Sequence, residues 1–212
     1  MLKLGITVVP GRFDRLPTGK LTEEIDGVTV TCMDVAMPMV IASAQSFGLT
    51  GHESVTELDE NRDFFQRMET IRQKAGVLMG MGDVSQSVTP KFGILAPARA
   101  GGTISARYFM PWNTHPSMAV TGAQCLASCV LTPGTVADGM AVKPNEIPAN
   151  IVLEHASGSI EVAVDYADTA AGFEIKSAGL VRTARKIAAG EVFIPSRIWA
   201  GHVNNDHADM EG

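Results

Sequence analysis

Residues 118–131 include no charged side chain, and their small and apolar character predicts a helix that is buried on all sides. Small residues between positions 117 and 123 form the expected turn into this helix, which we place at Thr121 and Gly122. The first turn of a helix leaves backbone N–H groups without intrahelical partners, and the helix dipole attracts anions to that end. The pattern therefore fits either a core helix entered by a tight turn or a site for a carboxylate or phosphate.

A second helix is expected at residues 59–79, where apolar residues recur at spacings of four, three, four and three. Such a stripe is typical of a surface helix that packs on a sheet, with charged residues such as Arg72 off the stripe. Asp59 or Asn61 can cap the start of this helix, and Gly80 suits the left-handed turn that ends it. The stripe consists of Phe64, Met68, Ile71, Ala75 and Leu78.

Alternating patterns predict that the rest of the chain is mostly strand. A turn at residues 26–27 leads into Val28, Val30 and Cys32, which alternate as in a half-buried strand. Pro38 lacks a backbone donor and should lie at a strand edge or in a bulge. Further strands are expected at 92–96, 103–110, 151–155, 159–166, 175–180 and 191–195, with a helix at 181–189. The class is therefore α+β, with an antiparallel sheet wrapped around a central helix.

Composition narrows the classes of partner. The chain has 212 residues and a net charge of -6 without a basic cluster, which argues against nucleic acid as a partner. No apolar run approaches the roughly 18 residues that span a bilayer, so no membrane partner is expected. Residues 1–15 are too polar for a signal peptide, and we expect a cytoplasmic protein. Cys32, Cys125 and Cys129 lack metal-site spacing and are interpreted as small buried apolar groups, although a redox or nucleophilic role is the alternative.

Residues 82–91 form a polar loop of small residues between the second helix and the strand at 92–96. Loops held between rigid elements carry function more often than the elements themselves. Lys91 is the cation of this segment, and it fits either a role in binding an anion or a solvated position at the start of a strand. The loop is therefore a second candidate region.

Several ordered motifs together resemble the PrpF family, which includes 2-methylaconitate isomerases and 4-oxalomesaconate tautomerases. The resemblance covers residues 16 to 199 and is closest to the 4-oxalomesaconate tautomerases of protocatechuate and gallate breakdown. The motifs are DG at 26–27, CMDVAMP at 32–38, GDVSQSVTPK at 82–91, ARYF at 106–109, His115 with AVTGA at 119–123, VRTARK at 181–186 and GEV at 190–192.

The resemblance implies a fold similar to diaminopimelate epimerase, in which two homologous halves each wrap a sheet around a central helix. The active site of that fold lies between the N-termini of the two helices. Family chains are much longer than this one, so the resemblance implies an unmatched segment at 1–15, the C-terminal half of an isomerase at 16–199 and a polar tail at 200–212.

The resemblance also implies the reaction, a 1,3-proton shift in a small unsaturated tricarboxylate such as 4-oxalomesaconate. Such a keto–enol tautomerisation or allylic isomerisation needs neither a metal nor an organic cofactor. The lysine and cysteine that the family uses belong to the first half, so no catalytic residue is assigned here. Ala119 stands where an epimerase of this fold carries its second catalytic cysteine. That replacement disfavours a cysteine-dependent epimerase, and Cys125 and Cys129 lie deeper in the helix.

Seven residues are candidates for substrate binding, on the basis of position and residue type. The TGA triplet of the helix turn would bind one carboxylate through backbone N–H groups, and the histidine would orient the substrate. The loop serines and lysine are weaker candidates for a second carboxylate. The seven are Thr121, Gly122, Ala123, His115, Ser85, Ser87 and Lys91.

The alternative function is a non-catalytic remnant or a small-carboxylate-binding module. In either case we expect a small di- or tricarboxylate as the ligand. By resemblance, the segment 180–195 would pack against the first half of the family fold, so its apolar residues call for a protein partner. We expect a complementary N-terminal half or a dimer or larger homo-oligomer. The apolar residues concerned are Leu180, Val181, Ile187, Val192, Phe193 and Ile194.

Overall fold

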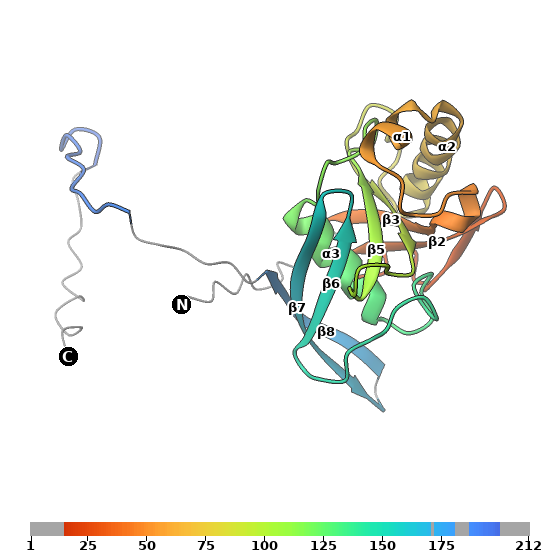
Figure 1. The fold of residues 1–212 in the computed structure, drawn as a ribbon. Helices are drawn as coiled ribbons and strands as arrows, with labels where there is room; N and C mark the ends of the chain where they lie inside the picture. Colours follow the sequence, from red (N-terminus) through yellow and green to blue (C-terminus); the bar gives the residue numbers. More distant parts are fainter. Residues whose placement is uncertain (1–14, 171, 181–186, 200–212) are drawn as a thin grey trace.

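The computed structural model describes residues 15–170, 172–180 and 187–199. Across these residues, eight strands form one sheet whose spatial order follows the chain, and the sheet curls around helix α3 (Figure 1). Five neighbouring pairs are antiparallel, whereas β3–β4 and β5–β6 are parallel. The predicted α+β class, with a mostly antiparallel sheet around a central helix, is confirmed. The strands are β1 (Glu23–Ile25), β2 (Val28–Asp34), β3 (Pro38–Ser43), β4 (Lys91–Ala96), β5 (Ile104–Phe109), β6 (Ala149–His155), β7 (Gly158–Thr169) and β8 (Gly172–Leu180).

Helix α3 (Val120–Leu131) is buried from Gly122 onward, as its lack of charged residues predicts. Its polar side chains bond internally: Gln124 Nε2 donates to the Ala178 carbonyl at 2.6 Å, and Ser128 Oγ donates to the Gln124 carbonyl at 2.8 Å. These bonds satisfy buried polar groups that would otherwise cost stability. The three cysteines are free and buried, in agreement with their interpretation as small apolar groups.

The outer face of β1–β5 is covered by a short 3-10 helix, η1 (Ala44–Phe47), and by α1 (Val55–Glu60) and α2 (Arg62–Leu78) (Figure 1). The single helix expected at 59–79 is thus two helices, interrupted at Asn61. Asn61 Oδ1 accepts the N–H of Phe64 at 3.0 Å and caps α2, as predicted. Gly80 has φ +74°, the left-handed turn expected after the helix. The buried stripe ends at Ala75, because Leu78 is exposed at the helix end.

Strand β2 is buried on both faces, so the expectation of a half-buried strand is wrong. Thr31 and Met33 are as buried as Val30 and Cys32, because α3 covers one face and α2 covers the other. Pro38 is the first residue of β3, which lies between β2 and β4. It therefore occupies the start of an inner strand rather than a sheet edge or a bulge.

The last described segment, residues 187–199, differs from expectation. The strand predicted at 191–195 is absent from this segment, and 187–189 are not helical. Apolar side chains here lack the burial that would favour a strand: Phe193 is 88% and Ile187 is 95% exposed. The segment lies apart from the sheet (Figure 1). Residues 1–14, 181–186 and 200–212, which include most of the predicted last helix and the polar tail, lie outside the described residues.

No helix in the described part of the chain is long and apolar enough to cross a membrane.

Candidate functional site

The N-terminus of α3 is the first candidate site. Ala119 is the N-cap residue in an extended conformation, and its side chain makes no capping hydrogen bond. The N–H of Ala123 donates to the Ala119 carbonyl at 2.8 Å, so the N–H groups of Val120, Thr121 and Gly122 precede this first helical bond. Val120 is 39% exposed and Thr121 is half-buried, so the end of an otherwise buried helix reaches the surface.

This geometry changes the predicted set of donors by one residue. The N–H of Ala123 is committed within the helix, so it is not a donor for a substrate carboxylate. Val120, which the sequence did not single out, supplies an earlier N–H instead. Val120 is the first residue of α3, whereas the sequence pattern predicted that the helix begins one residue later, at Thr121. A correct prediction of the helix start would have identified Val120. Thr121 and Gly122 keep their predicted places in the first turn.

Tyr108 of β5 connects the helix start to His115. A Cβ atom at position 122 would overlap the Tyr108 ring, so glycine is required for this close approach. The Tyr108 carbonyl accepts the N–H of His115 at 2.8 Å, and the two rings pack edge to face with centroids 5.8 Å apart. Burial raises the pKa of the Tyr108 hydroxyl, which therefore stays protonated. Tyr108 was missed as a site residue, although it lies in the ARYF motif.

His115 is oriented by its own loop. Its Nδ1 accepts the N–H of Ser117 at 3.0 Å, so a neutral imidazole carries its proton on Nε2. That nitrogen is consequently a hydrogen-bond donor whether or not the ring is charged. The structure thus brings Thr121, Gly122 and His115 together around Tyr108. The polar groups that they present are mainly hydrogen-bond donors, namely backbone N–H groups and the imidazole Nε2.

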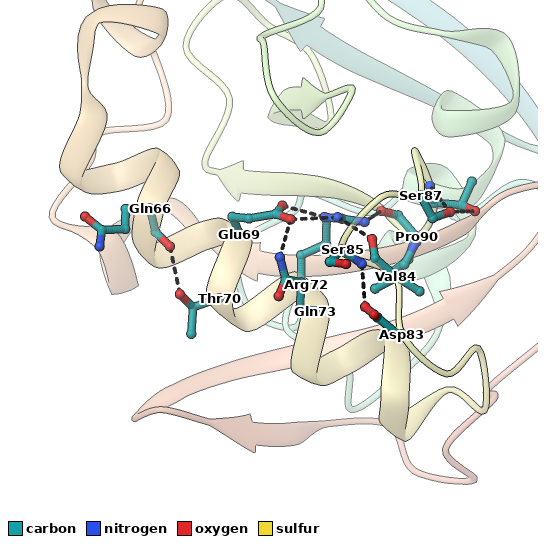
Figure 2. Close-up of polar contacts among 11 residues, drawn as sticks. Gln66, Glu69, Thr70, Arg72, Gln73, Asp83, Val84, Ser85, Ser87 and Pro90 are labelled. Atoms are coloured by element: carbon teal, nitrogen blue, oxygen red, sulfur yellow. Dashed lines mark hydrogen bonds and ion pairs between the residues drawn. The ribbon is translucent and has the colours of Figure 1, made fainter.

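The loop at 82–91 is fastened to α2 by a buried guanidinium (Figure 2). Arg72 Nη2 donates to the Val84 carbonyl at 3.0 Å, and Nη1 donates to the Pro90 carbonyl at 3.2 Å. Glu69 neutralises the charge by accepting from Nε at 2.6 Å and from Nη2 at 2.8 Å. Arg72, one of the charged residues that lie off the apolar stripe, is nevertheless fully buried against the loop.

The polar groups of this loop bond mostly within it. The N–H of Ser85 donates to Asp83 Oδ1 at 2.9 Å, and Ser87 Oγ lies 3.2 Å from Thr89 Oγ1 (Figure 2). Lys91 is half-buried at the start of β4, and burial, followed by the charge of Arg72, lowers its pKa. No hydrogen bond between described residues joins Ser85 or Ser87 to α3. Ser85 and Ser87, two of the weaker candidates, therefore bond within their own loop and not with the N-terminus of α3.

Comparison with known proteins gives consistent matches. A family model described as PrpF protein matches residues 10–195. YbhH of Escherichia coli K12 is 41% identical over 179 residues, which are 84% of this chain and 50% of YbhH. The 4-oxalomesaconate tautomerase of Pseudomonas putida KT2440 is 38% identical over 188 residues, which are 88% of this chain and 50% of that enzyme. The chain thus spans about half the length of the curated relatives it matches.

A crystal structure of methylitaconate-delta-isomerase shares the fold. Its TM-score is 0.75 at 23% sequence identity, over 90% of this chain and 54% of that one. At this level of identity the likeness concerns the fold alone. It agrees with the diaminopimelate-epimerase-like architecture that the sequence motifs imply.

Proposed function

The chain belongs to the PrpF family, and on that premise we propose that it forms the carboxylate-binding C-terminal half of an isomerase. The substrate is a small unsaturated tricarboxylate such as 4-oxalomesaconate, and the reaction is a 1,3-proton transfer without a cofactor. The domain occupies residues 16–199. The observation that carries this proposal is the accessible, uncapped N-terminus of the buried helix α3, where Gly122 packs on Tyr108.

The chemistry assigns this chain a stabilising role. In a 1,3-proton shift, a base removes a proton next to a carbonyl, and an acid returns a proton to the conjugated system. The enolate formed between these steps is stabilised by N–H donors that are already oriented. Val120, Thr121 and Gly122 supply such donors, and a protonated Nε2 of His115 supplies another. Ser85, Ser87 and Lys91 stay weaker candidates for binding a second carboxylate of the substrate.

We assign the proton-transfer groups to the other half of the relatives' length. Cys125 and Cys129 support this assignment because both are buried, and burial raises the pKa of each thiol, to about 12 for Cys129. A thiol with a raised pKa is a poor thiolate base at neutral pH. The alternative function, a carboxylate-binding module without catalysis, uses the same helix end.

A proline substitution tests the helix end with little structural change. Proline at the first helical position removes one N–H and keeps a helical φ, and the preceding Ala119 already has the extended ψ of 141° that proline favours. Val120→Pro should weaken binding of tricarballylate, a stable tricarboxylate, about tenfold by calorimetry, since one hydrogen bond to a charged group is lost. Val120→Ala keeps the N–H and should bind within about twofold of the unaltered chain.

Equal binding by Val120→Pro and Val120→Ala would contradict the proposed site. An ultraviolet assay of 4-oxalomesaconate turnover then separates the two functions. Little or no turnover is expected from this chain by itself, and turnover should appear when the N-terminal half of a relative is added. Binding without turnover in the mixture would favour the non-catalytic module.

Leu180, the first residue of the predicted docking segment 180–195, is buried at the end of β8, so its expected loss of packing is wrong. We propose that the rest of the segment docks on a protein partner, either a complementary N-terminal half or a second copy of this chain, through its described residues 187–195. The apolar side chains of this segment are exposed, and burying each is worth roughly 1.5–3 kcal/mol. In the absence of the other half, light scattering should report a dimer or larger. A stable monomer of 22.4 kDa would contradict self-association. We also propose that the protein is located in the cytoplasm.

A further inference from the structure

A cavity of about 350 Å³ lies where β5 and β6 separate. The two strands pair at only two positions, Ile104 with Leu153 and Ser105 with Glu154. Because Tyr108 packs in the core cluster that surrounds α3, its neighbour Arg107 faces the opposite side of β5. The cavity and the α3 N-terminus therefore lie on opposite sides of β5, although His155 in the cavity lining is close enough to His115 for the two rings to interact electrostatically. Its lining includes Ser105, Arg107, Glu154, His155, His52 and Gly102.

Arg107 is a buried cation that forms no salt bridge with any residue in the described part of the chain. Its side chain is part of a residue only 6% exposed. Nε donates to the Glu53 carbonyl at 2.8 Å, and Nη1 donates to the Ala106 carbonyl at 3.0 Å and to Ser105 Oγ at 3.3 Å. These acceptors are neutral, and Nη2 has no hydrogen-bond acceptor among the residues that the structure describes.

The nearby carboxylates are committed to backbone amides. Glu154 accepts the N–H groups of Arg99, Ala100 and Gly102 at 2.7–2.8 Å. Glu53 likewise accepts the N–H groups of Thr50 and Gly51 at 2.6 and 2.9 Å. Both carboxylates favour the charged form of Arg107 through space, but only the backbone carbonyls of Glu53 and Glu154, at 2.8 and 3.5 Å, accept hydrogen bonds from the guanidinium, and no carboxylate does so among the described residues. The N–H groups of Nη2 are therefore available to donate hydrogen bonds to an anionic ligand that enters the cavity.

Two histidines add to this donor character. His155 Nδ1 accepts the N–H of Ser157 at 3.3 Å, so the neutral ring carries its proton on Nε2 and remains a donor in both protonation states. Burial, then the charge of Arg107 and finally that of His115 lower the pKa of His155, whereas a hydrogen bond to the Ser159 backbone acts in the opposite direction, so a ligand at the His155 ring would compete with that backbone group. Burial, and then the charges of Arg99 and Arg107, lowers the pKa of His52, while Glu53 and Glu154 act in the opposite direction. The charges facing the two rings are therefore mixed, with the cations dominant.

We propose that this cavity binds a small carboxylate, with Nη2 of Arg107 as the main donor and His155 as the second. Nη2 carries two N–H groups that can donate charge-assisted hydrogen bonds to a carboxylate, and one negative charge offsets the single charge of the guanidinium. A doubly charged phosphate is disfavoured, because Glu53 and Glu154 lie nearby. The volume is at the lower end of the range for small-molecule sites.

Nuclear magnetic resonance of the full chain, labelled with ¹⁵N, tests this proposal. Acetate is added at constant ionic strength, with chloride and inorganic phosphate as comparisons. Acetate should cause saturable shifts in the amides of Gly101 and Gly102 and in the His155 ring, whereas chloride should not. Arg107→Gln should weaken acetate binding at least about tenfold, since a charge-assisted hydrogen bond is lost.

Arg99→Gln is the matched control. It removes a neighbouring guanidinium but keeps the backbone N–H that Glu154 accepts, so acetate affinity should change by less than about threefold. If Arg107→Gln does not fold, His155→Phe tests the same site, because it keeps Arg107 and removes the second donor, together with the Nδ1 that accepts the Ser157 N–H. It should weaken acetate binding about threefold.

Shifts that do not saturate, or that persist unchanged in both Arg107→Gln and His155→Phe, would overturn the proposal. Saturable shifts confined to the amides of Val120, Thr121 and Gly122 would also overturn it, while supporting the helix-end site. Equal or tighter binding of phosphate would overturn the assignment of a singly charged carboxylate. The two sites are thus tested by separate signals in one experiment.

Discussion

Arg72 and Arg107 are both buried guanidinium groups on the outer side of the sheet, yet their surroundings differ. Arg72 binds a carboxylate of its own helix and two carbonyls of a loop. Arg107 binds neutral oxygens, and its neighbouring acids bond to backbone amides instead. Burial alone therefore does not define the role of an arginine. Arg72 is paired with a carboxylate and holds a loop in place, whereas the guanidinium of Arg107 bonds only to neutral oxygens and can still bind an anionic ligand.

The largest expected effect is on folding, at Arg72. Arg72→Met should lower the free energy of unfolding by about 3 kcal/mol, because Glu69 and two carbonyls lose their partner. Urea denaturation measures this change. Lys74→Met on the same helix is the control, since the exposed pair of Lys74 with Asp26 should contribute at most about 1 kcal/mol. A similar loss in both variants would show that Arg72 is not a structural fastening.

A smaller loss is expected at Arg107. Arg107→Met should lower the free energy of unfolding by about 1–2 kcal/mol, because it leaves neutral acceptors that can be reached by water from the cavity. Acetate at about a hundred times its dissociation constant should raise the unfolding free energy of the unaltered chain by about 2.7 kcal/mol. The same acetate should not stabilise Arg107→Met. If acetate stabilised Arg107→Met as well, Arg107 would not be the group that binds acetate, and the proposed difference in role between Arg107 and Arg72 would be contradicted.

Acidification should weaken the Arg107 region before the Arg72 region. The pKa values of His52 and His155 are lowered from 6.5, so the unfolded chain binds more protons as the pH falls below that value, and stability decreases. The pKa of Glu69, next to Arg72, is lowered from 4.5, so its contribution is lost only below about pH 4.5. Unfolding free energies measured across this range should therefore fall in two steps. Replacing both histidines by glutamine should flatten the upper step, and an unchanged upper step would contradict this assignment.

The smallest effect is expected in the loop that Arg72 holds. Ser85→Ala should change the unfolding free energy by less than about 0.5 kcal/mol, because the backbone of the loop stays fastened. Tricarballylate affinity should fall about threefold if the Ser85 hydroxyl contributes to a second carboxylate site. Calorimetry decides this point. Identical affinity would remove Ser85 from the candidate site and leave the helix end unaffected.

Local pattern predicts the parts of this fold whose burial is decided by neighbours in the chain. The uncharged run of α3 and the apolar stripe from Phe64 to Ala75 are of this kind, and both are found as expected. Burial of Arg72 could not be predicted, because its acceptors at Val84 and Pro90 lie far along the chain and polar residues off a stripe normally face water. The strand expected at 191–195 fails for the same reason, since strand pairing depends on a partner strand rather than on apolar residues alone.

The candidate site follows the same division. Thr121, Gly122 and His115 belong to one continuous segment, and their grouping could be anticipated. The role of Tyr108 depends on contact between β5 and α3, which no spacing in the sequence reveals. Predicting that the Ala123 N–H bonds within the helix would require placing the first helical residue without an error of even one position. Helix ends are the part of a helix that sequence patterns locate least accurately.

The close approach of Gly122 to Tyr108 has a consequence for the timing of charge stabilisation. Van der Waals contact between a helix backbone and an aromatic ring leaves no flexible side chain to absorb a displacement. The dipoles at the start of α3 therefore keep the same direction before and after negative charge develops on a bound molecule. In the proposed reaction, such a fixed arrangement would avoid the energy that solvent or mobile side chains spend on reorientation, and this would lower the barrier as well as the dissociation constant.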